Sequence, residues 1–340
     1  MIGVIAAGGT IACEPGEGGY MPAASNALEA LLKETARLVG LEICLEPLGA
    51  GQTNAGPGGD SSTFGSSTWL ALHRQIEALS EKVDGIMILH GTDTMTHTAS
   101  ALSYLAPARR RSVVLTGSQL PAGAPGSDAK ANIRLALKAA AGDFGDLLGD
   151  TYIAFGGRVL RGNRATKLSS HAAEAFIADM SFLPGRSVER PTWELQRPVR
   201  AATRASGFSG PVISLNITPE MPLDILGHLL DERPPGSLLL NLYGIGSAPS
   251  AERLACWCDR LTQAGWLCLG RSQCVSGAID WSVYAVTEAF RSSALIDGSD
   301  IAHDAAVVKL MAAMDGGLGA DWLRTNVAGE LTPRHPEMAA

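Results

Sequence analysis

The sequence contains no long hydrophobic run and no excess of basic residues. No stretch of about 18 apolar residues occurs, so no transmembrane helix is predicted. Lys and Arg number 27 against 34 Asp and Glu, and this net charge of −7 argues against nucleic acid or an anionic membrane as a partner. A hydrophobic fraction of 46% excludes a mainly disordered chain, and 340 residues predict about two domains.

Cysteine is also scarce, with six residues in the chain. They show no metal-ligand spacing and are expected to be reduced, buried thiols. Cys256 and Cys258, two apart in a predicted helix, are expected on different faces. The opening apolar stretch is too short for a secretory leader and has no basic residue ahead of it. We therefore predict a first strand there, and a cytoplasmic protein.

Short apolar runs alternate with longer amphipathic ones, which predicts an α/β fold with a mainly parallel sheet and helices on both faces. An arginine-rich stretch with two Arg-Pro steps indicates a linker at 189–209. It separates a larger N-terminal domain, 1–188, from a smaller C-terminal α/β domain, 210–340. The glycine-rich segment 49–65 is predicted to be a surface loop. The predicted strands are 2–7, 85–89, 112–115, 151–155, 212–215, 237–242 and 267–270, and the predicted helices are 66–79, 94–105, 128–141, 221–230 and 251–264.

Polar, hydroxyl-rich turns follow three of the predicted strands. In open α/β sheets ligands bind outside the carboxyl ends of strands, so these turns would share one cleft if their strands are neighbours. The paired glycines of the first turn let the backbone bend sharply, and a threonine beside backbone N–H groups suits acyl transfer. A plain turn with a helix-capping threonine is the alternative. The turns are Gly8-Gly9-Thr10, His90-Gly91-Thr92-Asp93-Thr94 and Thr116-Gly117-Ser118.

Other residues near these turns have two interpretations each. Asp93 either caps the following helix or binds a substrate ammonium and activates a hydroxyl or water. His90 is more simply a packed, hydrogen-bonded histidine than a base. From residue types alone, segment 161–167 is more simply a solvated basic loop than the element that brings Lys167 into the cleft. Neither G-x-G-x-x-G nor G-x-x-x-x-G-K-[ST] occurs at these turns, which argues against nucleotide binding.

Two long motifs carry a family resemblance. Residues 85–95 read GIMILHGTDTM and residues 7–12 read AGGTIA, where the family's first signature normally reads TGGTIA. The sequence resembles the bacterial-type L-asparaginases, in their type I cytoplasmic branch. Asp60-Ser61-Ser62 resembles the family's substrate turn, although Thr63-Phe64 replaces the usual Asp-Met. Further matches at 19–22, 161–167, 243–249, 272–274 and 326–332 extend the resemblance over nearly the whole chain.

The resemblance implies a two-domain asparaginase-like fold and hydrolysis of L-asparagine to L-aspartate and ammonia. Thr10 would form the acyl-enzyme, Thr92, Asp93 and Lys167 would activate nucleophile or water, and Tyr20 would close over the site. The family uses no metal or organic cofactor and assembles as homodimers or homotetramers. The implied catalytic residues are Thr10, Tyr20, Thr92, Asp93 and Lys167, and the implied substrate-binding residues are Ser61, Ser62, Thr92, Asp93 and Ser118.

Three alternative functions follow from the same residues. The first is a broader glutaminase–asparaginase. Its two substrates differ by one methylene, which changes the free energy of discrimination by only about 1–3 kcal/mol. An ammonia-supplying amidotransferase subunit would carry an extra domain ahead of the Gly-Gly-Thr turn, which here starts at Gly8. A non-catalytic amino-acid-binding module would not need the nucleophile chemistry.

The resemblance also concerns regulation. Some type I enzymes have a second, allosteric asparagine site, of which Thr166 and Cys274 match the expected residues. The arginine and asparagine of that site correspond to Asn241 and Ser247 here. An arginine is the natural partner of a substrate carboxylate, and this site lacks it. We therefore expect the regulatory site to be absent or weak.

Overall fold

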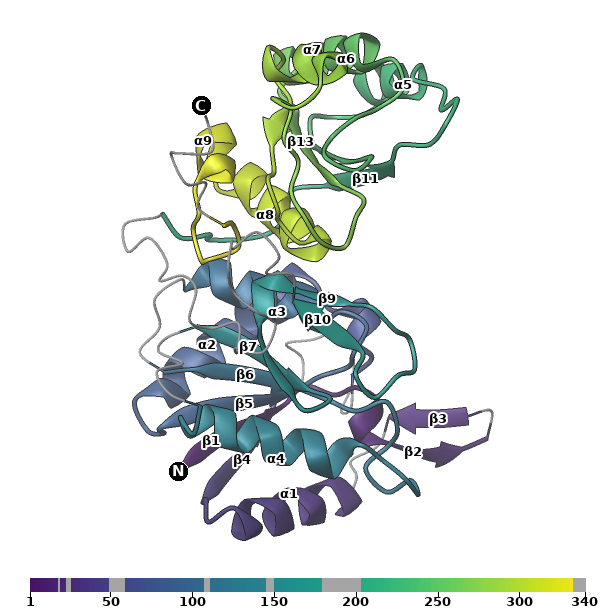
Figure 1. Ribbon diagram of the computed structural model, residues 1–340. Coiled ribbons are helices and arrows are strands. Elements are labelled where there is room, and N and C mark those ends of the chain that lie inside the picture. The colour runs from purple at the N-terminus through teal and green to yellow at the C-terminus, as the bar shows by residue number, and fades with distance from the viewer. Residues whose placement is uncertain are drawn as a thin grey trace. The chain divides into compact units, whose positions relative to one another are not determined.

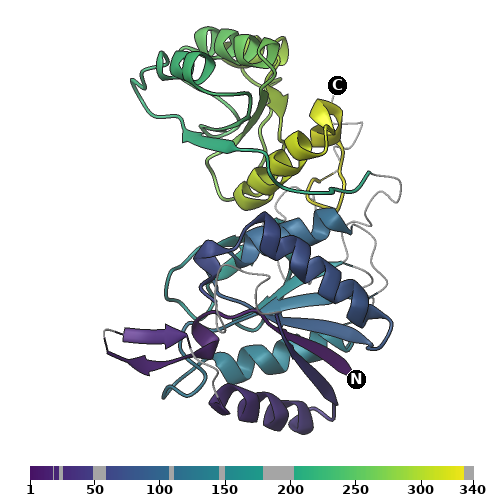
Figure 2. The same ribbon diagram turned by 180° about the vertical axis from the view of Figure 1, so that it is seen from behind.

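The computed structural model describes residues 1–17, 19–22, 26–48, 59–106, 111–144, 150–178 and 203–332. Of these, Met1–Ala178 form one compact unit (unit 1) and 203–332 a second (unit 2). Each unit is a sheet with helices on both faces, which confirms the predicted α/β class (Figures 1 and 2). Most of the predicted linker, 189–202, lies outside the described residues, as does 49–58 of the predicted glycine-rich loop.

Unit 1 contains a six-stranded sheet in the order β4-β1-β5-β6-β7-β8. All neighbours are parallel except β7 and β8, which pair antiparallel. The central strands are apolar along their length because helices bury both faces of a parallel sheet. The strands are β1 (Ile2–Ala6), β4 (Ile43–Pro47), β5 (Gly85–Leu89), β6 (Val113–Thr116), β7 (Thr151–Phe155) and β8 (Arg158–Arg161).

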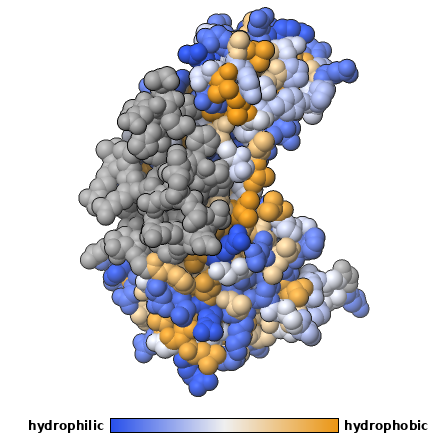
Figure 3. Space-filling view, in the orientation of Figure 1, coloured by the Kyte–Doolittle hydropathy of each residue, from blue (hydrophilic) through white to orange (hydrophobic). Residues whose placement is uncertain are grey.

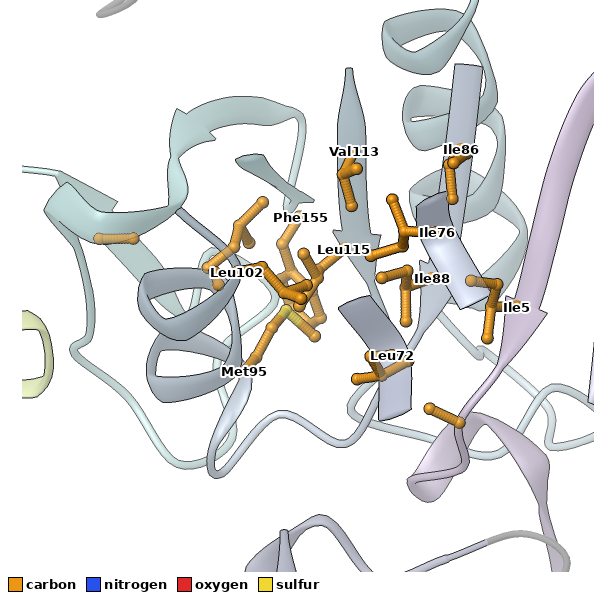
Figure 4. Close-up of a cluster of buried hydrophobic side chains, with 14 of the residues drawn as sticks. Ile5, Leu72, Ile76, Ile86, Ile88, Met95, Leu102, Val113, Leu115 and Phe155 are labelled. Carbon is orange, nitrogen blue, oxygen red and sulfur yellow. The ribbon is translucent and has the colours of Figure 1, made fainter. Parts of the chain in front are cut away.

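Alternating side chains of these strands divide the core of unit 1 into two layers. Helices α1 (Asn26–Leu38) and α4 (Ala129–Ala140) cover the face that presents Val4 and Met87. Helices α2 (Ser66–Ser80) and α3 (Met95–Leu105) cover the opposite face. Figure 4 shows this second layer, in which Ile5, Ile86, Ile88, Val113, Leu115 and Phe155 meet Leu72, Ile76, Met95 and Leu102.

The path of the chain through this sheet includes one unusual connection. The connection from β1 to β4 crosses the sheet face that α1 covers. The connections from β4 to β5 and from β5 to β6 run in the opposite direction along the sheet and cross the face that α2 and α3 cover. The step from β6 to β7 continues in the same direction but passes over the α1 face, through α4. The β6–α4–β7 connection therefore has the opposite hand to the other three, which is rare in parallel sheets. Its first loop carries Ser118.

Unit 2 contains a parallel four-stranded sheet in the order β11-β12-β13-β14. One face packs on α5 (Ile225–Glu232) and α6 (Ala251–Gln263), and the other contacts α8 (His303–Asp315) (Figures 1 and 2). The strands are β11 (Val212–Asn216), β12 (Ser237–Leu242), β13 (Leu267–Ser272) and β14 (Ile296–Asp297). On the face of the molecule drawn in Figure 3, hydrophilic residues are interspersed with small clusters of hydrophobic residues.

Two expectations from the sequence need correction. The helix expected at 221–230 covers Ile225–Glu232 instead: Pro222 disfavours a helical conformation for Met221, and Leu223 and Asp224 form a turn. All six cysteines are free, but only Cys258 and Cys268 are buried, so the expected burial is wrong for the other four. Cys256 is exposed, and its contrast with Cys258 confirms that the two point to different faces. Among the helices that the structure describes, none is long and apolar enough to cross a membrane.

A fully buried ion pair anchors the C-terminal segment of unit 2. Lys309 on α8 contacts Glu330 at 2.6 Å, and both side chains have 0% exposure. Lys309 Nζ also donates to the carbonyls of Leu323 and Thr325, and Glu330 accepts the N–H groups of Val327 and Ala328. The segment after α9 (Gly319–Arg324) is thus held to α8 by charge-assisted hydrogen bonds that compensate both buried charges.

Replacing Glu330→Gln should therefore lower the free energy of unfolding by about 3–5 kcal/mol, because an uncompensated ammonium remains buried. Urea denaturation at pH 7 measures this loss. The matched control is Glu288→Gln, which removes an exposed pair with Arg291 (N–O 2.9 Å) and should cost no more than about 1 kcal/mol. Equal losses for the two variants would show that the buried pair has no special role.

Candidate active site

The polar turns predicted from the sequence meet at the carboxyl edge of the unit 1 sheet. Parallel pairing places β1 directly beside β5, so the Gly-Gly-Thr turn lies against the turn that follows β5. Gly9 has φ 95°, and a Cβ built on it would lie 2.3 Å from Gly91 N. Only glycine permits both this backbone conformation and this approach. The contact places Thr10 and Thr92 on two touching turns.

The segment after β4 joins the same cluster. Gly9 N donates to the carbonyl of Gly59 (3.0 Å), and a Cβ on Gly91 would lie 2.3 Å from Ser61 Oγ. The Thr94 hydroxyl donates to the Ser61 carbonyl at 2.6 Å. Ser61 is only 3% exposed. The structure thus brings Ser61 to the turns that carry Thr10 and Thr92.

Asp60 shapes the turn on the other side of Ser61. Its carboxylate accepts from the backbone N–H and the hydroxyl of Ser62, at 2.9 and 2.7 Å. The backbone hydrogen bond and then the hydroxyl lower the pKa of Asp60. Burial, reinforced by the nearby Asp60 charge, raises the pKa of the Cys13 thiol. Ser62 is exposed and is held in place by Asp60.

Lys167 makes direct contact with the turn after β5. Its Nζ lies 2.9 Å from Thr92 Oγ1 and 2.6 Å from Asp93 Oδ1. Thr92 is 7% exposed, and the Lys167 side chain is 17% exposed. A charged ammonium only donates hydrogen bonds, so Thr92 Oγ1 accepts from Lys167 and directs its own proton elsewhere. This arrangement can stabilise negative charge on Thr92 or pass a proton to it.

The segment that delivers Lys167 is packed rather than solvated. Arg161 forms a 2.5 Å ion pair with Asp150, with side chains 8% and 2% exposed. Gly162 has no space for a Cβ, which would lie 2.6 Å from Ala99 on α3. This close packing brings Lys167, on β9 (Ala165–Lys167), to the turn that precedes α3. The interpretation of 161–167 as a solvated basic loop is therefore wrong.

Tyr20 and Ser118 have looser relations to this cluster. Tyr20 is 52% exposed on β3 (Gly19–Pro22), which pairs with β2 (Cys13–Gly16) directly after the Thr10 turn. The hairpin projects from unit 1 (Figures 1 and 2). Ser118 is buried after β6, and its hydroxyl donates to the Leu120 carbonyl, so its proton is used within the turn.

His90 is a structural histidine. It is fully buried, with Nε2 2.8 Å from Thr98 Oγ1 and Nδ1 2.7 Å from the Gly91 carbonyl. The Gly91 carbonyl only accepts, so the imidazole donates through Nδ1 and Nε2 accepts the hydroxyl proton of Thr98, whose Oγ1 accepts the indole N–H of Trp69. Burial lowers the pKa of His90 to about 4. These contacts confirm the packed, hydrogen-bonded interpretation.

Two supporting residues were not predicted to belong to the site. Asp128 accepts from the backbone N–H groups of Gln119 and Leu120, and Asn132 donates to the Gly117 carbonyl at 3.1 Å. Together they hold the turn after β6. A carboxylate at the first residue of a predicted helix is a local signal for capping, but a bond to a turn nine residues upstream is a tertiary contact.

The expected loss of the regulatory site involved Asn241 in unit 2. Asn241 is 1% exposed, and its Oδ1 accepts from Nη1 of Arg271 at 3.0 Å. Arg271 is the register partner of Asn241 on the next strand, β13. The guanidinium of Arg271 is thus bonded to Asn241 and, through Nε, to the Ile301 carbonyl at 3.1 Å. The expected absence or weakness of the regulatory site stays a prediction.

The sheet edge, the Gly-Gly-Thr turn and the Thr92–Asp93–Lys167 cluster together describe an enzyme of the nucleophilic acyl-transfer class. Comparison with known proteins agrees. The family profile described as "Asparaginase, N-terminal" matches residues 1–199. L-asparaginase 1 of Escherichia coli K12 is 30% identical over 342 aligned positions, covering 96% of each chain. The chain belongs to the asparaginase family of amidohydrolases.

Solved structures show the same relationship. The thermostable L-asparaginase from Thermococcus kodakarensis superposes with a TM-score of 0.79 at 25% identity, covering 98% of this chain and 99% of that one. L-asparaginase I from Vibrio cholerae superposes with a TM-score of 0.77 at 25% identity and the same coverage. The two-domain asparaginase-like fold predicted from the sequence is confirmed.

The buried His90 predicts a pH dependence of stability. Its pKa falls from 6.5 to about 4 on folding, so the unfolded chain binds a proton at higher pH than the folded chain does. Acidification through this range should remove stability, by about 3 kcal/mol in total, and none of this contribution is lost above pH 6.5. Urea unfolding at pH 7, 5.5 and 4 measures the slope. His90→Gln should flatten it, whereas His171→Gln, at an exposed histidine, should not. An unchanged slope in His90→Gln contradicts the assignment.

Proposed function

We propose that Thr10 is the nucleophile with which this chain hydrolyses L-asparagine to L-aspartate and ammonia. The observation that carries the proposal is the Lys167–Thr92 hydrogen bond, 2.9 Å long, on a turn that touches the Gly-Gly-Thr turn. The Thr10 hydroxyl attacks the side-chain amide carbon, and ammonia leaves as the acyl-enzyme forms. Water then hydrolyses the ester. Thr92 and Lys167 relay the protons that these steps release and consume.

The same cluster supplies contacts for the amino-acid part of the substrate. Asp93 uses one carboxylate oxygen for Lys167 and is 73% exposed, so its carboxylate is accessible to an α-ammonium group. Ser61 and Ser62 lie on the turn shaped by Asp60 and bind the α-carboxylate. Ser118 contributes at the edge of the substrate site. Tyr20 closes over the substrate from its hairpin, and the exclusion of water strengthens the polar contacts beneath it.

The family relationship supports two further parts of the proposal. The chain acts in the cytoplasm, and it assembles as a homodimer or homotetramer. Sedimentation equilibrium of the full chain tests the assembly, and a mass equal to one chain of 35.4 kDa at working concentrations would contradict it.

Thr10→Ala should lower kcat for ammonia release from L-asparagine by at least about 10³-fold, because the acyl-enzyme can no longer form. Lys167→Met should cost about 10²–10⁴-fold, the usual contribution of positioned acid–base groups. Both are measured by coupled detection of ammonia. Lys130→Met, at an exposed pair with Glu34 (2.7 Å), is the matched control and should keep full activity. Full turnover in Thr10→Ala would refute the nucleophile.

The ratio of kcat/KM for L-asparagine and L-glutamine decides the breadth of the activity. We expect L-asparagine to be preferred. One methylene changes binding by about 1–3 kcal/mol, so a ratio between about 10 and 200 indicates a dedicated asparaginase. A ratio near one contradicts this and identifies a glutaminase–asparaginase.

A further inference from the structure

A continuous chain of polar side chains lies on the α8 face of the unit 2 sheet. It starts at Arg271 on β13 and passes through Asn241 on β12 and Ser214 on β11 to His303 and Asp304, the first residues of α8. The contacts are Arg271 Nη1 to Asn241 Oδ1 (3.0 Å), Asn241 Nδ2 to Ser214 Oγ (3.0 Å), Ser214 Oγ to His303 Nε2 (3.1 Å) and His303 Nδ1 to Asp304 Oδ1 (2.9 Å).

The chemistry of the donors determines the direction of every bond. The guanidinium and the amide NH₂ group only donate, so Asn241 accepts from Arg271 and donates to Ser214. The hydroxyl proton of Ser214 is then directed at Nε2 of His303. The imidazole in turn donates from Nδ1 to the carboxylate of Asp304. A serine thus faces the basic nitrogen of a histidine whose tautomer is set by a carboxylate.

We propose that Ser214, His303 and Asp304 form a second acyl-transfer centre of this protein, which accepts small carboxylic esters. The three residues have the relation of nucleophile, general base and orienting carboxylate, which is recognised by geometry rather than by order in the chain. All of them belong to unit 2, whereas Thr10 belongs to unit 1. The proposed centre therefore shares no residue with the proposed asparaginase site.

Exposure divides the group into reacting and supporting residues. Ser214 is exposed, and the side chain of His303 is 39% exposed, so solvent and a small ester can reach both. Asn241 and Arg271 are 1% and 9% exposed. The nucleophile and the base thus lie at the surface, while the groups that polarise them are buried.

Asn241 provides a donor to the proposed nucleophile. Its Nδ2 donates to Ser214 Oγ at 3.0 Å and also contacts the Leu215 carbonyl at 3.4 Å, so it can stabilise negative charge on Oγ as the serine proton leaves. The guanidinium bonded to Asn241 Oδ1 draws electron density from the amide, which makes the NH₂ group a stronger donor. Burial lowers the pKa of Arg271 to about 10, against the opposing charge of Asp304, so Arg271 remains charged at neutral pH. Its Nε is anchored on the Ile301 carbonyl at 3.1 Å.

The reaction balances without any further reactant than water. Ser214 Oγ bonds to the ester carbonyl carbon while its proton passes to His303 Nε2. The carbon–oxygen bond to the alcohol breaks, and the alcohol leaves with that proton. Water attacks the acyl-serine, His303 takes one proton from it, and this proton returns to Ser214 as the carboxylic acid departs.

A fluorophosphonate probe tests the centre because it reacts with serines activated by a base. We expect mass spectrometry of the full chain to find the probe on Ser214. His303→Gln should slow labelling by at least about 100-fold, the usual contribution of a general base. Asp304→Asn should slow it as well, since the imidazole loses the acceptor that sets its tautomer. Ser282 is the matched control: its hydroxyl bonds to Asp280 at 2.6 Å, and Ser282→Ala should leave labelling of Ser214 unchanged.

Hydrolysis of p-nitrophenyl acetate provides a second readout. In a Thr10→Ala background, residual ester turnover should disappear when Ser214→Ala is added. Thermal unfolding of each variant verifies that the fold is kept. No probe on Ser214, or equal labelling rates in His303→Gln and the unmodified chain, would overturn the proposal. Because the label is located on one residue and asparagine turnover is not measured, this result is independent of whether Thr10 is the asparaginase nucleophile.

Discussion

The proposed asparaginase site depends on the contact between Gly9 and Gly91. A methyl group at either position would collide, with the backbone of Gly91 in the first case and with Ser61 in the second. Because Gly9 and Gly91 have no side chains, the turns after β1 and β5 can touch, and the segment around Ser61 can pack against the turn after β5. Lys167 then reaches Thr92 from β9 because Gly162 also packs closely on α3. The polar cluster is thus assembled by glycines that carry no chemistry themselves.

Around this cluster, buried polar groups act as fixed supports. His90 has both ring nitrogens bonded and burial keeps it neutral, so it braces the turn after β5 and cannot serve as a base. The buried Arg161–Asp150 ion pair holds the segment that leads to Lys167 in place. In unit 2 the Lys309–Glu330 pair holds the C-terminal segment on α8. Each support is charged or strongly polar, and each is compensated by a specific partner, as buried polar groups must be.

The two units use similar architecture for different local chemistry. In unit 1 the proposed reacting groups lie in turns beyond the strand ends. In unit 2 the Ser214–His303–Asp304 group lies across strands and the start of α8, and its polarity comes from side chains, above all from Arg271. The two proposed centres thus use different parts of a mainly parallel sheet, one its edge and the other its face.

The sequence by itself determined the parts of this protein that depend on local patterns. Apolar runs bounded by glycine-rich turns located the central strands, and the motifs at 7–12 and 85–95 predicted site roles for Thr10, Thr92 and Asp93. The solvated loop that the residue types favoured at 161–167 was wrong, because burial of arginines depends on partners such as Asp150 and on packing against α3. Only the tertiary structure decided which distant side chains meet: Lys167 and Thr92 are 75 residues apart, and Ser214 and His303 are 89 apart. Strand order and helix placement produce such contacts, and neither is written in any local pattern of residues.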